Sequence, residues 1–346
     1  MLFLRIILYP FTFIYGLLVT VRNFLFDSNI FRAVSVQARV ISVGNITVGG
    51  SGKTPAVNML AGLLKRAGRK CAVISRGYGR KSSGYLLVSD GKNLFTSAEQ
   101  SGDEIYMTAL ESCVPAAVAE KRVEGAQRLL KDIQADTLLL DDAFQHRWIK
   151  RDVDILLFDQ NFLLSHSSLS HSLLPSGFLR EPFSSMKRAD VIIINRKFSE
   201  KAELPQYFCR HAGSKKIFTA YYRDNNLYDV RNHSSYALGE FKGQKSLVVS
   251  GVADPASFLN VLSKHDVNTD NHLIFRDHKH YTNKEVQSIR KMFYATNSHS
   301  VITTQKDAVK LVEYRKELDD IDIYYLKIEM VLDEENEFYD FLLSKI

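Results

Sequence analysis

The stretch VGNITVGGSGKTP, residues 43–55, decides the fold that we expect for this chain. It continues the apolar run RVISV and leads into PAVNMLAGLLKRAG, whose apolar residues recur at helical spacing. A strand, a glycine-rich loop and a helix in this order form a phosphate-binding turn, because loop N–H groups and the helix N-terminus face the anion. The stretch therefore predicts a P-loop nucleotide-binding domain.

The loop departs from the strict GxxxxGK[ST] pattern, because Thr47 stands where that pattern has its first glycine. It is closer to the variant KGGxGK[ST], with Val48 in place of the lysine. We expect Lys53 to reach the β- and γ-phosphates of ATP and the Thr54 hydroxyl to bind Mg²⁺. The residues expected to surround the phosphates are Thr47, Val48, Gly49, Gly50, Ser51, Gly52, Lys53 and Thr54.

Short apolar runs alternate with helical patterns on both sides of this turn. DTLLLDD, VDILLFD and DVIIINR are near-continuous apolar runs, typical of parallel strands buried on both faces. The alternation predicts a doubly wound, mostly parallel α/β sheet over residues 31–205. A second set of β and α patterns predicts a smaller α/β domain over residues 241–346, joined through an extended linker at 206–240.

Polar residues follow several of these runs. Asp141 and Asp142 follow the run TLLL, at the sheet edge that carries the glycine loop, and predict a Mg²⁺ site. Asp103 and Glu104 stand at a predicted helix start, where acidic residues also simply complement the helix dipole. His278, in RDHKHY, follows an apolar run and is a further candidate for the site; the alternative is a histidine with a purely structural role.

Four further residues, at the ends of predicted elements, are candidates for phosphate or nucleotide contacts, because arginine binds phosphate in a bidentate manner. They are Arg76, Tyr78, Arg122 and Arg180. The segment HSSLSHS, residues 166–172, is non-periodic and indicates a mobile surface loop, with a metal site as the less favoured alternative.

Composition narrows the class of protein. With 346 residues and 45% apolar content, the chain is long enough for two domains with real cores. A net charge of +6 suits an anionic membrane surface or a phosphorylated substrate, whereas the lack of a long basic run speaks against nucleic acid. Nothing indicates an obligate protein partner. The three cysteines are widely separated, which favours a reducing compartment over a disulfide framework or zinc.

Residues 1–26 are strongly apolar. Sixteen uncharged residues separate Arg5 from Arg22, and Pro10 and Gly16 interrupt them. A membrane span needs about 20 apolar residues. A cleaved signal peptide would leave a nucleotide site outside the cell. The alternatives are a helix over 1–30 lying in the membrane interface and a helix buried against the fold; flanking arginines and aromatic residues favour the first.

Taken together, these pieces resemble one family. SVGNITVGGSGKTP, SRGYGR, SGDE, LDDAFQH, LPSGFLREP, INR and FRDHKHY through TTQKDAVKL occur in the order found in the tetraacyldisaccharide 4'-kinases, the lipid A 4'-kinases of Gram-negative bacteria. The resemblance covers nearly the whole chain. Two positions depart from the family pattern: Ala143 where glycine is more frequent, and Gln305 where glutamate is usual.

The resemblance implies a kinase that moves the γ-phosphate of ATP to the 4'-hydroxyl of an acylated glucosamine disaccharide 1-phosphate. It would work at the cytoplasmic face of the inner membrane, as a peripheral or monotopic protein held through residues 1–26. The implied roles are as follows: Asp103 as catalytic base supported by His278; Lys53, Thr54, Glu104, Asp141 and Asp142 on phosphate and Mg²⁺; Arg122 and Arg180 on phosphate; and Tyr78 lining the site.

Two other functions fit parts of the sequence. One is an ATPase switch of the KGGxGK[ST] type, which works through dimerisation, although Val48 removes the lysine that acts across such a dimer. The other is a soluble kinase of a small molecule, in which the apolar N-terminal segment would be a packed helix.

Overall fold

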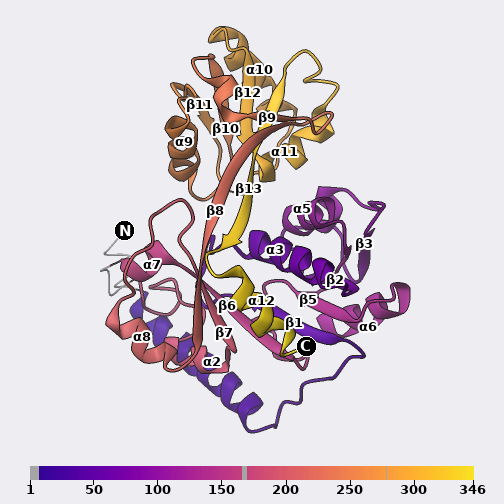
Figure 1. The fold of residues 1–346 in the computed structure, drawn as a ribbon, viewed down its shortest axis with the longest axis vertical. Helices are drawn as coiled ribbons and strands as arrows, with labels where there is room; N and C mark the ends of the chain where they lie inside the picture. Colours follow the sequence, from indigo (N-terminus) through magenta and orange to yellow (C-terminus); the bar gives the residue numbers. More distant parts are fainter. Residues whose placement is uncertain (1–7, 166–169, 278) are drawn as a thin grey trace. The chain divides into compact units, whose positions relative to one another are not determined.

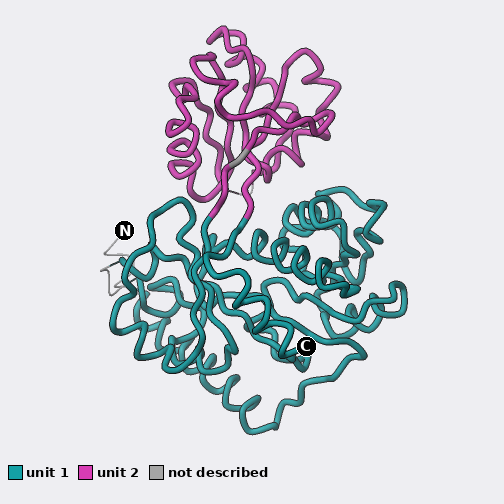
Figure 2. The backbone as a smooth tube through the Cα atoms, viewed as in Figure 1, with its two compact units in different colours: residues 1–221, 330–346 teal, residues 222–329 magenta. Residues whose placement is uncertain are grey.

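The computed structural model describes residues 8–165, 170–277 and 279–346 (Figure 1). The chain divides into two compact units (Figure 2). Unit 1 comprises residues 1–221 and 330–346, and unit 2 comprises residues 222–329.

Unit 1 is built on a mostly parallel sheet in the strand order β8–β7–β6–β1–β5–β2–β4–β3. The pairs from β8 to β4 are parallel, and β3 joins the edge antiparallel to β4. The predicted doubly wound, mostly parallel α/β sheet is therefore confirmed. The strands are β1 (Arg39–Gly44), β2 (Cys71–Ser75), β3 (Leu86–Asp90), β4 (Pro115–Val118), β5 (Thr137–Leu140), β6 (Val153–Asp159), β7 (Val191–Asn195) and β8 (Lys216–Asp229).

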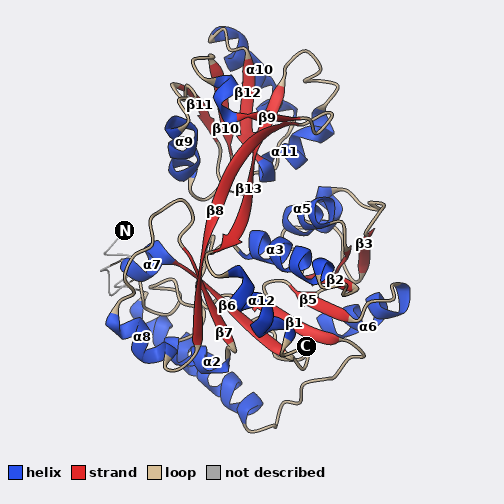
Figure 3. Cartoon of the chain, viewed as in Figure 1, coloured by secondary structure: helices blue, strands red, loops and turns tan. Residues whose placement is uncertain are grey.

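Helices cover this sheet, which explains why its strands are apolar on both faces (Figure 3). Leu138 and Leu140 of β5 pack with Leu129 of α6, whereas Phe158 of β6 packs with Phe208 of α8. The helices of unit 1 are α2 (Tyr9–Asp27), α3 (Lys53–Arg66), α4 (Ala98–Ser101), α5 (Asp103–Ser112), α6 (Arg122–Asp132), α7 (Gln160–Leu164), η1 (Phe183–Arg188), α8 (Gln206–Ala212) and α12 (Glu335–Leu343).

The C-terminal residues 330–346 belong to unit 1 and not to the second domain, which the sequence predicts over residues 241–346. The ring of Phe338, on α12, is fully buried and lies 5.2 Å from the ring of Phe218 on β8 in an edge-to-face arrangement. The backbone N–H of Asp333 donates to the carbonyl of Thr219 at 2.9 Å. Apolar cover for β8 is therefore supplied by the end of the chain.

The segment 206–240, predicted as an extended linker, instead holds α8, β8 and the short strand β9 (Ser235–Ala237). The chain enters unit 2 within β8 and leaves it within β13 (Ile323–Leu332). Continuous strands thus take the place of the linker.

Unit 2 has a parallel sheet in the order β11–β10–β12–β13, and β9 pairs antiparallel with β8. Val249, Ile289 and Ile323 belong to its core, which lies between this sheet and its helices. Its remaining elements are η2 (Leu238–Phe241), β10 (Ser246–Ser250), α9 (Pro255–Lys264), β11 (Asn271–Ile274), α10 (Asn283–Ala295), β12 (Ser300–Thr304), α11 (Gln305–Leu311) and η3 (Val312–Tyr314).

The HSSLSHS segment is only partly described, because residues 166–169 lie outside the described ranges. His171 is half-buried, with Nε2 3.0 Å from the carbonyl oxygen of Phe162. Its ring packs against those of Phe162 and Tyr207. The described end of this segment is thus packed, contrary to the expected mobile loop.

Candidate active site

The glycine loop connects β1 to α3 at the carboxyl edge of the sheet. Gly49 and Gly52 have φ of 103° and 91°, a region that glycine enters without strain. Asn45 is buried and donates from Nδ2 to the hydroxyl of Ser51 at 2.9 Å, and Asn195 donates to the carbonyl of Ser51 at 3.1 Å. The loop is therefore held from beneath by two asparagines, while α3 begins at Lys53.

Asp141 follows β5 and is almost fully buried. One carboxylate oxygen, Oδ2, accepts a hydrogen bond from Ser75 at 3.0 Å. The other, Oδ1, has no hydrogen-bond partner among the described residues. Burial, and then the charges of Glu104 and Asp142, raise the pKa of Asp141 to about 6. This carboxylate therefore carries an acceptor oxygen that the protein itself does not satisfy.

The Asp142 carboxylate is paired with two basic side chains. Its carboxylate lies 3.8 Å from Nζ of Lys53, and Nη1 of Arg180 donates to both of its oxygens at 3.0 Å. Burial alone would raise the pKa of Asp142, but Lys53 and Arg180 hold it below its ordinary value. Its φ of 44° shows that the turn after β5 is tight. The carboxylate is therefore charged and oriented by residues from α3 and from the 170–182 segment.

Arg122 begins α6 and is buried beneath the same turn. Its Nη2 lies 3.5 Å from the carbonyl oxygen of Asp141 and 3.4 Å from that of Asp142. Burial lowers the pKa of Arg122, and the two carboxylates oppose that effect. His146 lies nearby, and burial together with the charge of Arg122 lowers its pKa to about 4, so its imidazole is neutral at pH 7.

Asp103 and Glu104 are the first two residues of α5, and both are half-buried. Gly102 precedes them with a φ of 97°, and a Cβ there would lie 3.0 Å from the carbonyl oxygen of Tyr78. The loop that carries Tyr78 is thus packed against the start of α5. Tyr78 itself is 74% exposed.

Two predicted site residues need separate comment. The N–H of Val48 donates to the carbonyl of Phe178 at 2.8 Å, so it is already engaged within the protein. His278 belongs to unit 2 in sequence and lies outside the described residues. The remaining candidates all come from unit 1.

The donor set suits a cation that needs phosphate oxygens to complete its shell. Among the described residues, no group of three His, Cys, Asp or Glu side chains is close enough to hold a metal by itself. Mg²⁺ usually keeps several waters and binds through one or two carboxylates together with substrate phosphates. Oδ1 of Asp141, which is buried and has no hydrogen-bond partner in the part of the chain that the structure describes, fits that chemistry.

Comparison with known proteins gives the family. The profile of the LpxK family, described as tetraacyldisaccharide-1-P 4'-kinase, matches residues 4–346. The tetraacyldisaccharide 4'-kinase of Halothermothrix orenii is 36% identical over 338 residues, covering 92% of this chain and 87% of the relative. The chain belongs to this family.

Further members agree over similar lengths. The tetraacyldisaccharide 4'-kinase of Flavobacterium psychrophilum is 35% identical over 347 residues, covering 98% of this chain and 95% of that one. A crystal structure described as the "apo" form of LpxK from Aquifex aeolicus in complex with ATP aligns with a TM-score of 0.81 and 31% identity over 99% of both chains. Membership of a kinase family removes the ATPase switch as an alternative.

Three residues around the site are not identified by the sequence analysis. Ser75 supports Asp141, Asn45 supports the loop, and Glu181 lies next to Arg180. Asn45 lies in the motif GNIT and Glu181 lies in the motif FLREP, so these motifs are the sequence signal that could have identified both residues. Ser75 ends an ordinary apolar strand and gave no signal.

Proposed function

We propose that this protein performs the reaction of its family in the site described above. That reaction is the transfer of the γ-phosphate of ATP to the 4'-hydroxyl of an acylated glucosamine disaccharide 1-phosphate. The observation that carries the residue assignment is the convergence of Lys53, Arg122 and Arg180 on the turn at Asp141 and Asp142. These residues come from four separate segments and meet beside the glycine loop.

The glycine loop and its cations would bind the phosphates of ATP. Backbone N–H groups of a glycine loop and the start of α3 favour negative charge. Lys53 and Arg180 both contact Asp142 and would reach outward to phosphate oxygens, which form strong charge-assisted hydrogen bonds with such donors. Tyr78 would line the nucleotide.

Thr54, Glu104, Asp141 and Asp142 would hold Mg²⁺, which when bound neutralises charge on the phosphates. The raised pKa of Asp141 supports this role, because a carboxylate that repels its neighbours gains from a cation. Arg122, beneath the turn, would keep the two carbonyls of the acidic pair in place.

Asp103 would act as the general base. It would take the proton of the 4'-hydroxyl while that oxygen bonds to the γ-phosphorus and the bond from phosphorus to the β,γ-bridging oxygen breaks, releasing ADP. A positioned base contributes about 10²–10⁴-fold to such a transfer. His278, from the motif RDHKHY of unit 2, would assist this proton transfer.

The test measures transfer of label from γ-labelled ATP to an acylated disaccharide 1-phosphate. Asp103→Asn keeps the shape of the helix start and should lower kcat by about 10²–10⁴-fold with ATP affinity retained. Glu124→Gln is the matched control, because it also removes a carboxylate from a first helical turn, and Glu124 is exposed and paired with the neighbouring Lys121. Near-normal turnover by Asp103→Asn would remove Asp103 from this role.

We also propose that α2 holds the enzyme at the cytoplasmic face of the inner membrane as a peripheral or monotopic protein. Among the described residues, no helix is long and apolar enough to cross a bilayer. The outward face of α2 is nevertheless apolar: Phe13, Leu18 and Phe24 are 75%, 64% and 62% exposed. A surface helix normally turns its apolar side to the core, so this reversed arrangement favours insertion into an interface.

Vesicle binding tests this second proposal. Replacing Phe13 and Leu18 by serine removes outward apolar area without touching the inward side, and should weaken partitioning to anionic vesicles at least tenfold. Thr20→Ala, on the exposed side of the same helix, is the control. Unchanged partitioning of the double variant would exclude α2 as the membrane contact.

A further inference from the structure

The inward side of α2 is unusual because it is joined to unit 1 by polar groups. The Thr12 hydroxyl donates to the hydroxyl of Ser176 at 2.7 Å and accepts from the backbone N–H of Ser176 at 3.2 Å. The Tyr15 hydroxyl donates to the carbonyl of Arg180 at 2.9 Å. Both partners lie in residues 173–181, which we call the strap.

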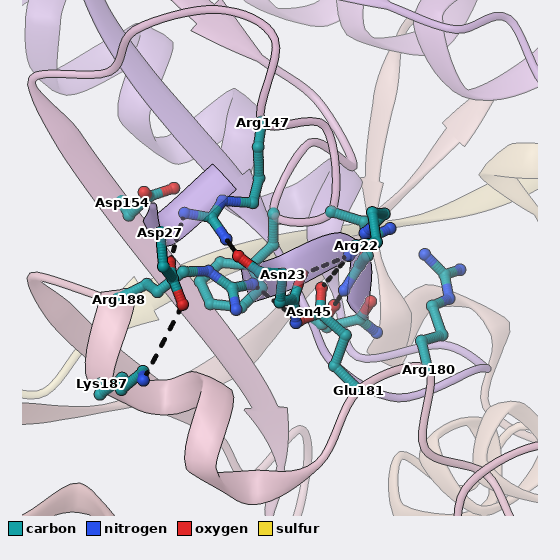
Figure 4. A network of polar contacts seen from close by, with 12 residues as sticks. Arg22, Asn23, Asp27, Asn45, Arg147, Asp154, Arg180, Glu181, Lys187 and Arg188 are labelled. Carbon is teal, nitrogen blue, oxygen red and sulfur yellow. Dashed lines mark hydrogen bonds and ion pairs between the residues drawn. The ribbon is translucent and has the colours of Figure 1, made fainter. Parts of the chain in front are cut away.

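The last strap residue, Glu181, carries the charged contacts between the strap and α2 (Figure 4). Glu181 is fully buried, and its carboxylate accepts from Nη2 of Arg22 at 3.0 Å and from Nδ2 of Asn23 at 2.8 Å. Arg188 of η1 lies 2.9 Å from the same carboxylate. Burial alone would raise the pKa of Glu181, but Arg188, Asn23 and Arg22 hold it below its ordinary value. Removing one partner of a buried charge strongly lowers the stability of the folded protein, so we expect these contacts to persist.

The opposite edge of the strap is bonded to the glycine loop. The N–H of Arg180 donates to the carbonyl of Ile46 at 2.7 Å, and the N–H of Val48 donates to the carbonyl of Phe178 at 2.8 Å. Thr47 and Leu179 form an antiparallel bridge between these two bonds. The strap therefore lies between α2 and the phosphate-binding loop, with backbone or side-chain bonds to both.

Arg180 and Glu181 divide the strap's side chains between its two neighbours. The Arg180 guanidinium reaches Asp142 in the candidate active site, while the next residue, Glu181, reaches α2. Figure 4 shows Arg180 extending away from the cluster around Glu181. Arg180 and Glu181 are adjacent in the chain, so holding Glu181 restrains the backbone from which the Arg180 side chain extends.

We propose that the polar inward side of α2, through Asn23, Arg22 and Tyr15, positions Arg180 and the glycine loop for phosphoryl transfer. This inference rests on the proposed role of Arg180 at the phosphates. Asn23, Arg22 and Glu181 are positioning residues, because they contact one another and act through the adjacent Arg180. The outward face of α2 would then contact the membrane, and its inward side would position Arg180 at the phosphate site.

One consequence is that lipid binding and nucleotide binding are coupled. An anionic membrane that holds α2 in one orientation also restrains the strap, and by linkage the nucleotide would strengthen membrane binding to the same degree. Couplings of this kind are typically about 5–150-fold in affinity.

A double-mutant cycle tests the positioning role with substrate dispersed in detergent, where partitioning to vesicles does not matter. Asn23→Ala should lower kcat by about 10- to 100-fold with little change in KM for the lipid, because small misplacements of a catalytic group have effects of that size. In an Arg180→Ala background, Asn23→Ala should lower kcat less than twofold further. A merely structural role for Asn23 would give additive losses and would overturn the proposal.

Two further variants keep the test decisive if Asn23→Ala folds poorly. Tyr15→Phe removes only the hydroxyl that bonds the Arg180 carbonyl, and should lower kcat severalfold in a folded protein. Thr20→Ala is the control, because its hydroxyl donates to the Gly16 carbonyl within α2 and not to the strap, and its kcat should be normal. Normal kcat for both Tyr15→Phe and Asn23→Ala would refute the positioning role.

The coupling is measured as ATP affinity with and without anionic vesicles. Wild-type protein should bind ATP at least about fivefold more tightly with vesicles, and Asn23→Ala should lose that gain while still partitioning to them. Equal gains in both proteins would overturn the inference. Failure of the proposed function looks different: Arg180→Ala would then retain full turnover, whereas failure of this inference alone leaves Arg180→Ala impaired and Asn23→Ala active.

Discussion

Each unit places a buried carboxylate at the carboxyl edge of a parallel sheet. The two carboxylates differ in their hydrogen-bond donors and in the charges around them. In unit 2, Asp307 follows β12 and is fully buried. Its Oδ2 accepts from the N–H of Gly251 at 2.8 Å and from the hydroxyl of Thr304 at 2.7 Å. In unit 1, Asp141 follows β5 and receives one hydroxyl, from Ser75, while Glu104 and Asp142 repel it.

The difference favours a structural role for Asp307 and is consistent with the proposed ligand-binding role of Asp141. Asp307 closes the turn after β10 and the start of α11 with its own backbone and hydroxyl donors. Oδ1 of each carboxylate has no hydrogen-bond partner among the described residues. Asp141, however, has a single hydroxyl donor and two neighbouring carboxylates, and its pKa is raised, an arrangement that lowers the stability of the ligand-free protein. Proteins tolerate such local conflicts mainly at functional sites.

Replacement of Asp141 should have the largest effect on stability, and in the stabilising direction. The pKa of this group rises from 3.8 to about 6 on folding, so stability falls as pH rises between those values, where only the unfolded chain has released the proton. At pH 8, Asp141→Asn should raise the free energy of unfolding by up to about 3 kcal/mol. Denaturant titration without Mg²⁺ or nucleotide measures this.

The same variant should lose Mg²⁺-dependent ATP binding, since the amide cannot supply the carboxylate charge. Asp142→Asn is the matched comparison, because its carboxylate is paired with Arg180 and Lys53 and its pKa is held low. It should lower stability at pH 8, and the loss should disappear as pH falls through the folded pKa. A loss of stability in Asp141→Asn would contradict the inference that the charged Asp141 carboxylate destabilises the ligand-free protein.

Replacement of Asp307 should have a somewhat smaller and opposite effect. Asp307→Ala leaves the buried N–H of Gly251 without its acceptor, which costs about 1–3 kcal/mol. Unfolding followed by a probe in unit 2 should show this loss, while ATP affinity remains normal because the glycine loop belongs to unit 1. Weakened ATP binding in a folded Asp307→Ala protein would show that this edge also serves the nucleotide.

Ser75→Ala should have the smallest effect, and a specific one. Its hydroxyl favours the charged form of Asp141, so removing it raises the pKa of that carboxyl further. Because a hydrogen bond of this kind contributes about 1 kcal/mol, the acid limb of Mg²⁺-dependent ATP binding should move up by roughly half to one pH unit. Calorimetric titrations across pH 5–8 measure the shift, and an unmoved limb would exclude Asp141 as the titrating group.

Much of the site was predictable because its residues stand in short, ordered motifs. The loop through Lys53, the pair Asp141 and Asp142, and Arg180 all follow recognisable local patterns, and the structure brings them together. Ser75 was not predictable, because its contact with Asp141 depends on the neighbouring placement of β2 and β5.

Sequence alone specified the parallel α/β sheet, the phosphate loop and the apolar N-terminal helix, because periodicity and turn chemistry act over a few residues at a time. Only the tertiary structure showed that α2 turns its apolar side outward and holds Glu181 with Arg22, 159 positions away in the chain. It also showed that residues 330–346 return to unit 1. Such contacts depend on how all the elements pack, so no local pattern contains them.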